Sequence, residues 1–161
     1  MPELPEVETV LRGISPFLEG NEIEYAQVNR PDLRRPFPQN LAERLKNRKI
    51  NFLYRRSKYI LMDLSEGETL LIHLVMSGRI LISQEAQGAF HHNKAQSQKH
   101  DHFILHLKDS HQLTFNDPRR FGVIDLLETG SLEGSATLAH IGPEPLSNSF
   151  KAKVGCIFFF I

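Results

Sequence analysis

The chain has 161 residues, which is enough for one domain with a sizeable core. Its 19 Lys and Arg residues balance its 19 Asp and Glu residues, so the net charge gives no indication of a polyanionic partner. No apolar run reaches the length of a membrane span, and the acidic start lacks the basic region of a signal peptide. The single cysteine, Cys156, excludes an intramolecular disulfide and a multi-cysteine zinc site within this chain. We therefore expect a cytoplasmic protein with no membrane partner.

The first six residues carry an unusual chemical possibility. Removal of Met1 would leave Pro2 as a secondary amine beside the Glu3 carboxylate. An α-amine has a pKa near 8, so a usable fraction is an uncharged nucleophile at neutral pH. Attack on a sugar C1′ or an aldehyde would form an iminium, by the logic of a lysine Schiff base. The alternative is that Pro2 and Pro5 simply begin a helix, where proline fits the first turn.

After Pro5, apolar residues recur at helical spacing: Val7, Val10, Leu11, Ile14 and Leu18. They predict a helix whose end is not sharply defined but lies before Gly20. Such a helix would bury one stripe and hold the amino terminus in place. The next part, residues 30–58, carries ten basic residues against Asp32 and Glu43. This local excess is either a solvated face or a phosphate-binding footprint.

Short strands dominate the rest of the chain. Residues 22–29 are predicted as a strand, 31–38 as a loop carrying Arg34 and Arg35, and 39–47 as a short helix. Further strands are predicted at 50–54, 59–64, 69–76, 79–83, 102–107, 112–116 and 123–127. Short strands separated by turns indicate an antiparallel sandwich or barrel with a helix in front. We expect partial disorder in the polar loop between Ser83 and His100, and irregular structure over 128–149.

Three groups of residues invite functional hypotheses. Lys58, at a strand junction, is an ordinary surface lysine or a cation that steers a phosphate near the amino terminus. His100 and His102 could chelate a metal from one strand face, although their neighbours His91 and His92 fall in the polar loop. The segment 117–122 is a hairpin turn or, with its two arginines and a phenylalanine, a device for opening duplex DNA. Met76 is a candidate second apolar plug.

Together these segments resemble the amino-terminal domain of the bacterial formamidopyrimidine-DNA glycosylase family. The matching blocks, in family order, are PELPEVET (residues 2–9), RSKY (56–59), HLVMSG (73–78), KHDH (99–102), DPRRFG (117–122) and HIGPEPL (140–146). Leu4 favours this family over the endonuclease VIII-type enzymes, which usually carry Gly there. The resemblance implies an α+β, mainly β fold: a two-layer antiparallel β-sandwich with an amino-terminal helix and a second short flanking helix.

The resemblance also implies an activity: removal of oxidised purines such as 8-oxoguanine and formamidopyrimidines, followed by β,δ-elimination at the abasic site. By analogy, Pro2 would attack C1′, Glu3 would supply the proton, Glu6 would assist, and Lys58 would bind phosphate and help the elimination. The DNA-binding positions implied are His73, Met76, His100, Arg119, Arg120 and Phe121. The expected partner is duplex DNA containing an oxidised purine or an abasic site, bound by a monomer.

The sequence departs from the family in two places. Val75 replaces the usual glycine before Met76. The expected organisation is a catalytic domain over 1–150 and an abnormal tail over 151–161, without the family's helix–two-turns–helix domain and four-cysteine zinc finger. We accordingly expect no cofactor or metal in this chain, and weak or no activity because phosphate contacts would be lost. A non-catalytic DNA-binding fragment and a metal-binding β-domain remain the alternatives.

Overall fold

The computed structural model describes residues 3–84 and 99–142. Pro2, His91, His92 and the tail over 151–161 with Cys156 lie outside these residues. The chain forms two compact units, residues 1–130 and 131–161. None of the helices in the described residues is long and apolar enough to cross a membrane.

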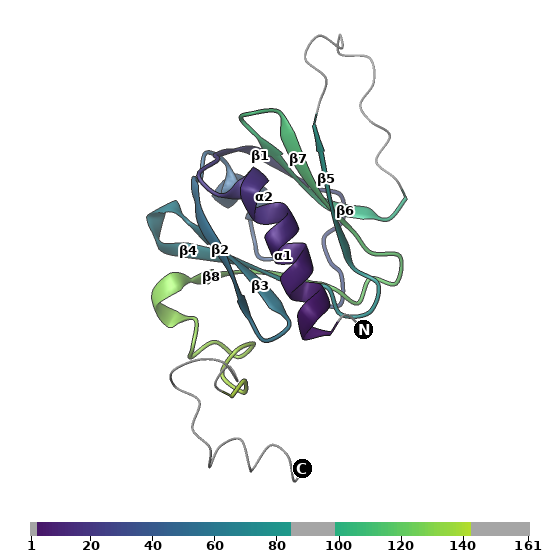
Figure 1. Ribbon diagram of the computed structural model, residues 1–161, viewed down its shortest axis with the longest axis vertical. Coiled ribbons are helices and arrows are strands. Elements are labelled where there is room, and N and C mark those ends of the chain that lie inside the picture. The colour runs from purple at the N-terminus through teal and green to yellow at the C-terminus, as the bar shows by residue number, and fades with distance from the viewer. Residues whose placement is uncertain (1–2, 85–98, 143–161) are drawn as a thin grey trace. The chain divides into compact units, whose positions relative to one another are not determined.

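The first unit contains two four-stranded antiparallel sheets (Figure 1). One sheet has the order β1-β6-β7-β5 and comprises Ile23–Val28, Asp101–Leu107, His111–Asn116 and Arg79–Gln84. The other has the order β2-β3-β4-β8 and comprises Ile50–Arg56, Tyr59–Leu64, Glu68–His73 and Val123–Glu128. The predicted α+β, mainly β sandwich is therefore confirmed.

Helix α1, Leu4–Leu18, packs against β2, β3 and β5, and Figure 1 shows it lying across the front of the two sheets. Its buried stripe is Val7, Leu11, Ile14 and Leu18. These residues follow one another at intervals of four, three and four, the spacing that places side chains on one helix face. Pro16 lies inside the last turn without ending the helix. The predicted anchoring of the amino-terminal segment by one apolar stripe is confirmed.

The second helix and the core complete this unit. Helix α2, Leu41–Leu45, buries both of its leucines and packs against β1, as the predicted short flanking helix. The largest fully buried side chains of the sandwich include Phe103 and Phe115. Short 3₁₀ turns at Ser65–Gly67 and Thr129–Ser131 follow β3 and β8.

The described part of the second unit consists of turns. The Leu138 amide donates to the Ser135 hydroxyl at 3.2 Å, and the Ala139 amide donates to the Ser135 carbonyl at 2.8 Å. The irregular structure expected over 128–149 begins after Glu128, the last residue of β8, and is confirmed from there as far as residue 142.

One strand prediction was wrong at its end. The strand expected over 69–76 stops at His73, and residues 75–77 form a turn. The amide of Gly78 donates to the carbonyl of Leu74 at 3.0 Å, and Val75 has a φ of 52°. A positive φ cannot continue a strand, so the apolar run Leu74-Val75-Met76 turns away from the sheet.

Candidate active site at one end of the sandwich

Strand register brings the predicted site segments to one end of the sandwich. In the β2-β3-β4-β8 sheet, His73 at the end of β4 pairs with Tyr59 at the start of β3 and with Val123 at the start of β8. In the other sheet, Asn116 at the end of β7 pairs with Arg79 at the start of β5 and with Asp101 at the start of β6. Lys58, His100 and the loops 74–78 and 117–122 therefore emerge from the same end.

Glu3, the first described residue, lies at this end. It caps α1, and its backbone amide donates to Oε2 of Glu6 at 3.0 Å. Its own carboxylate oxygen Oε2 lies 3.2 Å from Nζ of Lys58. Pro2 lies outside the described residues, but it is bonded directly to Glu3. The first described residue, Glu3, thus presents its carboxylate to an ammonium group, while Glu6 holds the backbone of Glu3.

Lys58 is presented by the tight turn between β2 and β3. Ser57 in this turn has a φ of 52°, and its carbonyl accepts a hydrogen bond from Arg55 Nη1 at 2.9 Å. Arg55 Nε also lies 2.9 Å from Oε2 of Glu8, so a second ion pair ties α1 to this hairpin. The hydrogen bond from Arg55, followed by that from Arg12, lowers the pKa of the Glu8 carboxyl. These contacts position the Lys58 ammonium relative to Glu3.

His73 is half-buried next to this pair. Its ring lies against the ring of Tyr59, with centroids 4.3 Å apart. Burial, and then the positive charges of Lys58 and Arg34, lower the pKa of His73 to about 4. The imidazole is therefore neutral at pH 7, when it can donate one hydrogen bond.

Arg34 is a site residue that sequence reasoning did not assign. Its loop follows β1. The end of β1 lies at the same end of the sandwich, which we call the rim, because the amide of Asn29 donates to the carbonyl of His102 at 3.0 Å. After burial and Lys58, the positive charge of Arg34 is the third cause that lowers the pKa of His73. The available signal in the sequence was an arginine pair between prolines, but nothing there placed it beside residues 58 and 73.

The loop between β4 and β5 presents Met76 to solvent with 50% of its surface exposed. The preceding residue, Val75, is 8% exposed and adopts a left-handed backbone conformation, with φ of 52°. The family's usual glycine would adopt this conformation freely, whereas a β-branched residue is strained there. The backbone therefore places strain on Val75, at the position where the resemblance implies a glycine.

The loop between β7 and β8 presents three more of the predicted residues. Arg119, Arg120 and Phe121 are all exposed, Phe121 by 42%. The turn alternative also holds, because the Arg120 amide donates to the Asp117 carbonyl at 3.3 Å. Residues 117–122 therefore form a turn, as one alternative predicted, and this turn also exposes the arginines and the phenylalanine on which the other alternative depends.

The metal hypothesis receives no support from the histidines that the structure describes. His102 is 3% exposed, and its Nε2 lies 2.8 Å from the Asp117 carbonyl. A carbonyl only accepts, so that nitrogen carries a proton and points into the protein. The rings of His100 and His102 are 6.5 Å apart, and residues 3–84 and 99–142 hold no group of three or more potential metal ligands.

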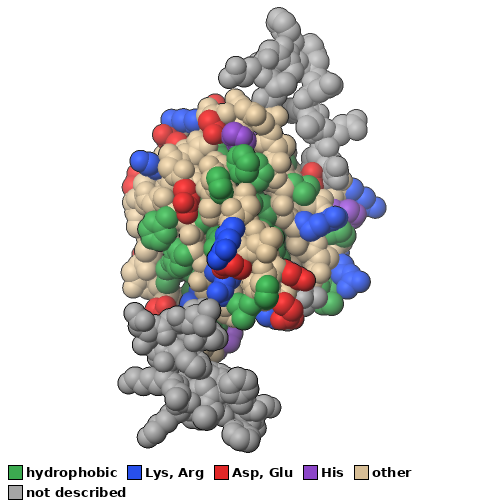
Figure 2. Space-filling view, in the orientation of Figure 1, with side chains coloured by type: hydrophobic (Ala, Val, Ile, Leu, Met, Phe, Trp, Pro, Cys, Tyr) green, Lys and Arg blue, Asp and Glu red, His purple; other side chains and the backbone are tan. Residues whose placement is uncertain are grey.

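Five of the ten basic residues in the segment 30–58 form ion pairs that the structure describes. Its ion pairs are Arg30–Asp32, Arg44–Glu68, Arg48–Glu66, Arg48–Glu68, Arg55–Glu8 and Lys58–Glu3. On the face shown in Figure 2, basic side chains are scattered and several lie next to acidic ones. We therefore restrict the phosphate-binding hypothesis to Arg34 and Lys58, the cations of this segment at the rim.

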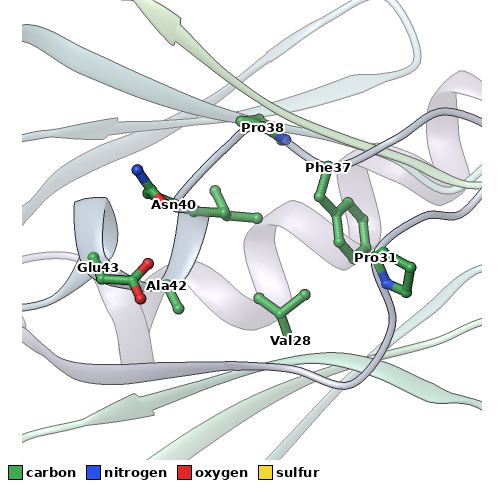
Figure 3. A pocket seen from close by; sticks show the side chains of 8 residues that line it. Val28, Pro31, Phe37, Pro38, Asn40, Ala42 and Glu43 are labelled. Atoms are coloured by element: carbon green, nitrogen blue, oxygen red, sulfur yellow. The ribbon is translucent and has the colours of Figure 1, made fainter.

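A separate groove of about 340 Å³ lies beside α2 (Figure 3). Its lining is mainly apolar, with Val28, Pro31 and Phe37 on its wall, and Asn40 and Glu43 contribute polar groups. None of the predicted site residues lines it, and it lacks a nucleophile paired with a base. The groove therefore offers no competing catalytic site.

Comparisons with known proteins agree with this arrangement. Residues 1–124 match the model of the formamidopyrimidine-DNA glycosylase N-terminal domain. Formamidopyrimidine-DNA glycosylases of Roseobacter denitrificans and Ruegeria pomeroyi are each 56% identical over 150 residues, 93% of this chain and 53% of the relative. The chain thus spans about half the length of the curated relatives it matches.

Solved structures give the same result. The Lactococcus lactis formamidopyrimidine-DNA glycosylase, noncovalently bound to DNA with an abasic site, has a TM-score of 0.80 and 29% identity. That match covers 95% of this chain and 55% of the other. A variant of the same protein in complex with Fapy-dG containing DNA has a TM-score of 0.79 and 30% identity, covering 95% and 53%.

Proposed function

Because the chain belongs to the formamidopyrimidine-DNA glycosylase family, we propose that it carries the catalytic groups of a base-excision repair enzyme acting on oxidised purines in duplex DNA. The observation that carries the proposal is the 3.2 Å pair between Glu3 and Lys58. Glu3 is bonded to Pro2, and the pair lies at the end of the sandwich where Met76 and Phe121 are exposed.

The proposed first step uses Pro2 as nucleophile. With Met1 removed, its secondary amine attacks C1′ of the damaged nucleotide, the bond to the base breaks, and the amine loses its proton. The C1′–O4′ bond then opens with protonation of O4′, and an iminium joins protein and sugar. Glu3 is placed to deliver a proton to the sugar or the departing base. With Met1 retained, the Pro2 nitrogen is an amide and this route is closed.

The proposed second step cleaves the strand by β- and then δ-elimination. Lys58 holds the phosphate and its charge favours departure of that phosphate, while Glu3 can accept or return protons at hydrogen-bond distance. Glu6 acts through the backbone: it accepts a hydrogen bond from the Glu3 amide and so holds the backbone of Glu3 at the start of α1. Neutral His73, with Arg34 near it, is suited to donate to a phosphate oxygen.

The DNA-facing part of the proposal concerns the exposed tips of the two loops. Met76 and Phe121 are apolar groups of a size that fills the space of an unstacked base, and Arg119 can donate to the orphaned partner base. Arg120 and His100 are assigned to the DNA backbone on the same rim. The partner is duplex DNA with an oxidised purine or an abasic site.

Borohydride trapping on a duplex with an abasic site tests the proposal. We expect a small amount of covalent adduct, in line with the weak activity expected of this chain, and a peptide map that places the sugar on Pro2. We expect Glu3→Gln and Lys58→Ala to reduce this adduct at least tenfold, the effect of losing one strong interaction. Lys108→Ala is the matched control because Lys108 also pairs with a carboxylate, Glu22 at 2.6 Å, but beyond the other end of β6. Intact-mass analysis of the same sample reports whether Met1 is absent.

A second candidate is DNA binding without catalysis. Duplex binding by fluorescence anisotropy with no trapped adduct, in protein shown to lack Met1, would establish it in place of the first. Trapping that is unchanged in Glu3→Gln and Lys58→Ala would contradict the roles assigned to these two residues.

A further inference from the structure

Asp117 is a buried carboxylate that the proposed chemistry does not use. Its residue is 0% exposed, between exposed Pro118 and the core strand β7. Burying a carboxylate costs several kcal/mol unless it is hydrogen-bonded. The hydrogen-bond partners of Asp117 therefore indicate the structural role of this buried group.

The carboxylate of Asp117 bonds to both loops that carry the exposed tips. Oδ1 accepts from the hydroxyl of Ser77 at 2.5 Å, across 40 residues of sequence, and from the amide of Arg119 at 3.2 Å. Oδ2 accepts from the amide of Gly122 at 2.7 Å. One side chain thus joins the Met76 loop to the loop of Arg119 and Phe121.

The backbone of Asp117 reaches a third segment. Its amide donates to the carbonyl of His100 at 2.9 Å, and its carbonyl accepts from Nε2 of His102 at 2.8 Å. The segment preceding β6 is therefore held by the same residue. Three chain segments with proposed DNA contacts meet at this one position.

The ring of Phe115 lies beneath both loops. A Cβ built on Gly78 would lie 3.1 Å from Cζ of Phe115, and one built on Gly122 would lie 2.5 Å from the same atom. Each loop therefore ends on a glycine that packs against one fully buried ring. Phe115 supplies the floor, and Asp117, two residues further along, supplies the hydrogen bonds.

We propose that Asp117, through Ser77, is a positioning residue that holds the Met76 loop and the Arg119–Phe121 loop in one arrangement for simultaneous entry into duplex DNA. This inference rests on the proposed function. Two separate loops that enter a base stack together lose conformational entropy on binding, and a bond formed beforehand between them reduces that loss. Asp117 itself makes no contact with DNA in this proposal.

The first experiment needs no DNA. Hydrogen exchange is measured on the full chain and on Ser77→Ala, Asp117→Asn and the control Ser65→Ala, whose hydroxyl accepts from the Lys49 amide instead. We expect Ser77→Ala to speed amide exchange in residues 117–122, and Asp117→Asn to speed exchange of the Gly78 amide. Each of these two substitutions thus acts on the loop to which it does not belong, whereas the control Ser65→Ala should leave both loops unchanged. Unchanged exchange across the loops overturns the coupling.

The second experiment measures binding to a duplex with a tetrahydrofuran abasic analogue and to the matched intact duplex. We expect Ser77→Ala to lower the preference for the abasic duplex about tenfold, as for one lost hydrogen bond to a charged group. Binding to the intact duplex should stay unchanged. The double variant should lose no more preference than the worse single variant, because both remove the same bond.

The outcomes separate the two proposals. A parent chain that prefers the abasic duplex, with Ser77→Ala and Asp117→Asn equally selective, overturns the positioning role and leaves the proposed function intact. Equal loss on both duplexes also overturns it, because that result indicates partial unfolding. A parent chain without any preference refutes the proposed function, and the exchange measurement then decides whether Asp117 couples the loops.

Discussion

Val75 offers the most direct test of the backbone at the Met76 loop. Its side chain is 8% exposed, and its φ of 52° lies in the left-handed region. We compare Val75→Gly with Val123→Gly, since Val123 is 9% exposed in strand β8 and has no positive φ. The two changes remove the same side chain from similar burial, so they differ mainly in backbone strain.

The expected magnitudes follow from these observations. Removing a buried valine side chain costs about 2–3 kcal/mol, and the greater freedom of glycine in the unfolded chain adds about 0.5–1 kcal/mol at either position. At Val75 the substitution also releases left-handed strain of roughly 1–2 kcal/mol. Val75→Gly should therefore cost about 1–2 kcal/mol less than Val123→Gly.

Urea unfolding of both variants and the parent measures this difference, provided that the dependence on urea is the same for all three. Equal costs would refute strain at Val75, and a larger cost at Val75 would show that its packing outweighs the backbone term. Val75→Ala is an additional check. A positive φ is unfavourable for alanine as well, so this substitution should release little of the backbone strain.

Glycine substitutions and one histidine give further tests. Gly122→Ala would place a Cβ 2.5 Å from Phe115 and should cost about 1–3 kcal/mol in urea unfolding. Gly13→Ala, within α1 and with no heavy atom within 4 Å, should instead gain about 0.5–1 kcal/mol, and the reverse order would contradict the packing described. The pKa of His73 should appear near 4 in an NMR titration, and a midpoint at the ordinary 6.5 would contradict the burial of the imidazole and the influence of Lys58 and Arg34. Since that folded pKa lies below the unfolded value, the stability contributed by neutral His73 is complete above pH 6.5 and is lost as pH falls towards 4.

The elements of the fold were predictable because their signals are local. The apolar spacing of α1 and the turn residues between short strands depend on near neighbours in sequence, so the helix and strand positions agree with the structure. The end of β4 was missed for a related reason: Leu74, Val75 and Met76 favour a strand locally. Their turn depends on the connection from one sheet to the other.

The sequence by itself determined the family and predicted the chemical groups of the site. Glu3, Lys58, Met76 and the loop 117–122 were predicted from residue type and from the motifs that carry the resemblance. Which of them meet is a property of register, because antiparallel pairing brings the end of one strand to the start of its neighbour. That pairing placed Lys58 and His73 at one rim with the exposed loops.

Only the tertiary structure decided which charges remain available. A count over residues 30–58 gave a strong positive excess, yet Glu8, Glu66 and Glu68 lie outside that window and pair with its arginines. The role of Asp117 also depends on a distant partner. A turn motif explains this residue locally, but its hydrogen bond from Ser77 joins two separate loops. Residue type is written in the chain, whereas the neutralisation of a charge and the coupling of two loops depend on distances that only folding sets.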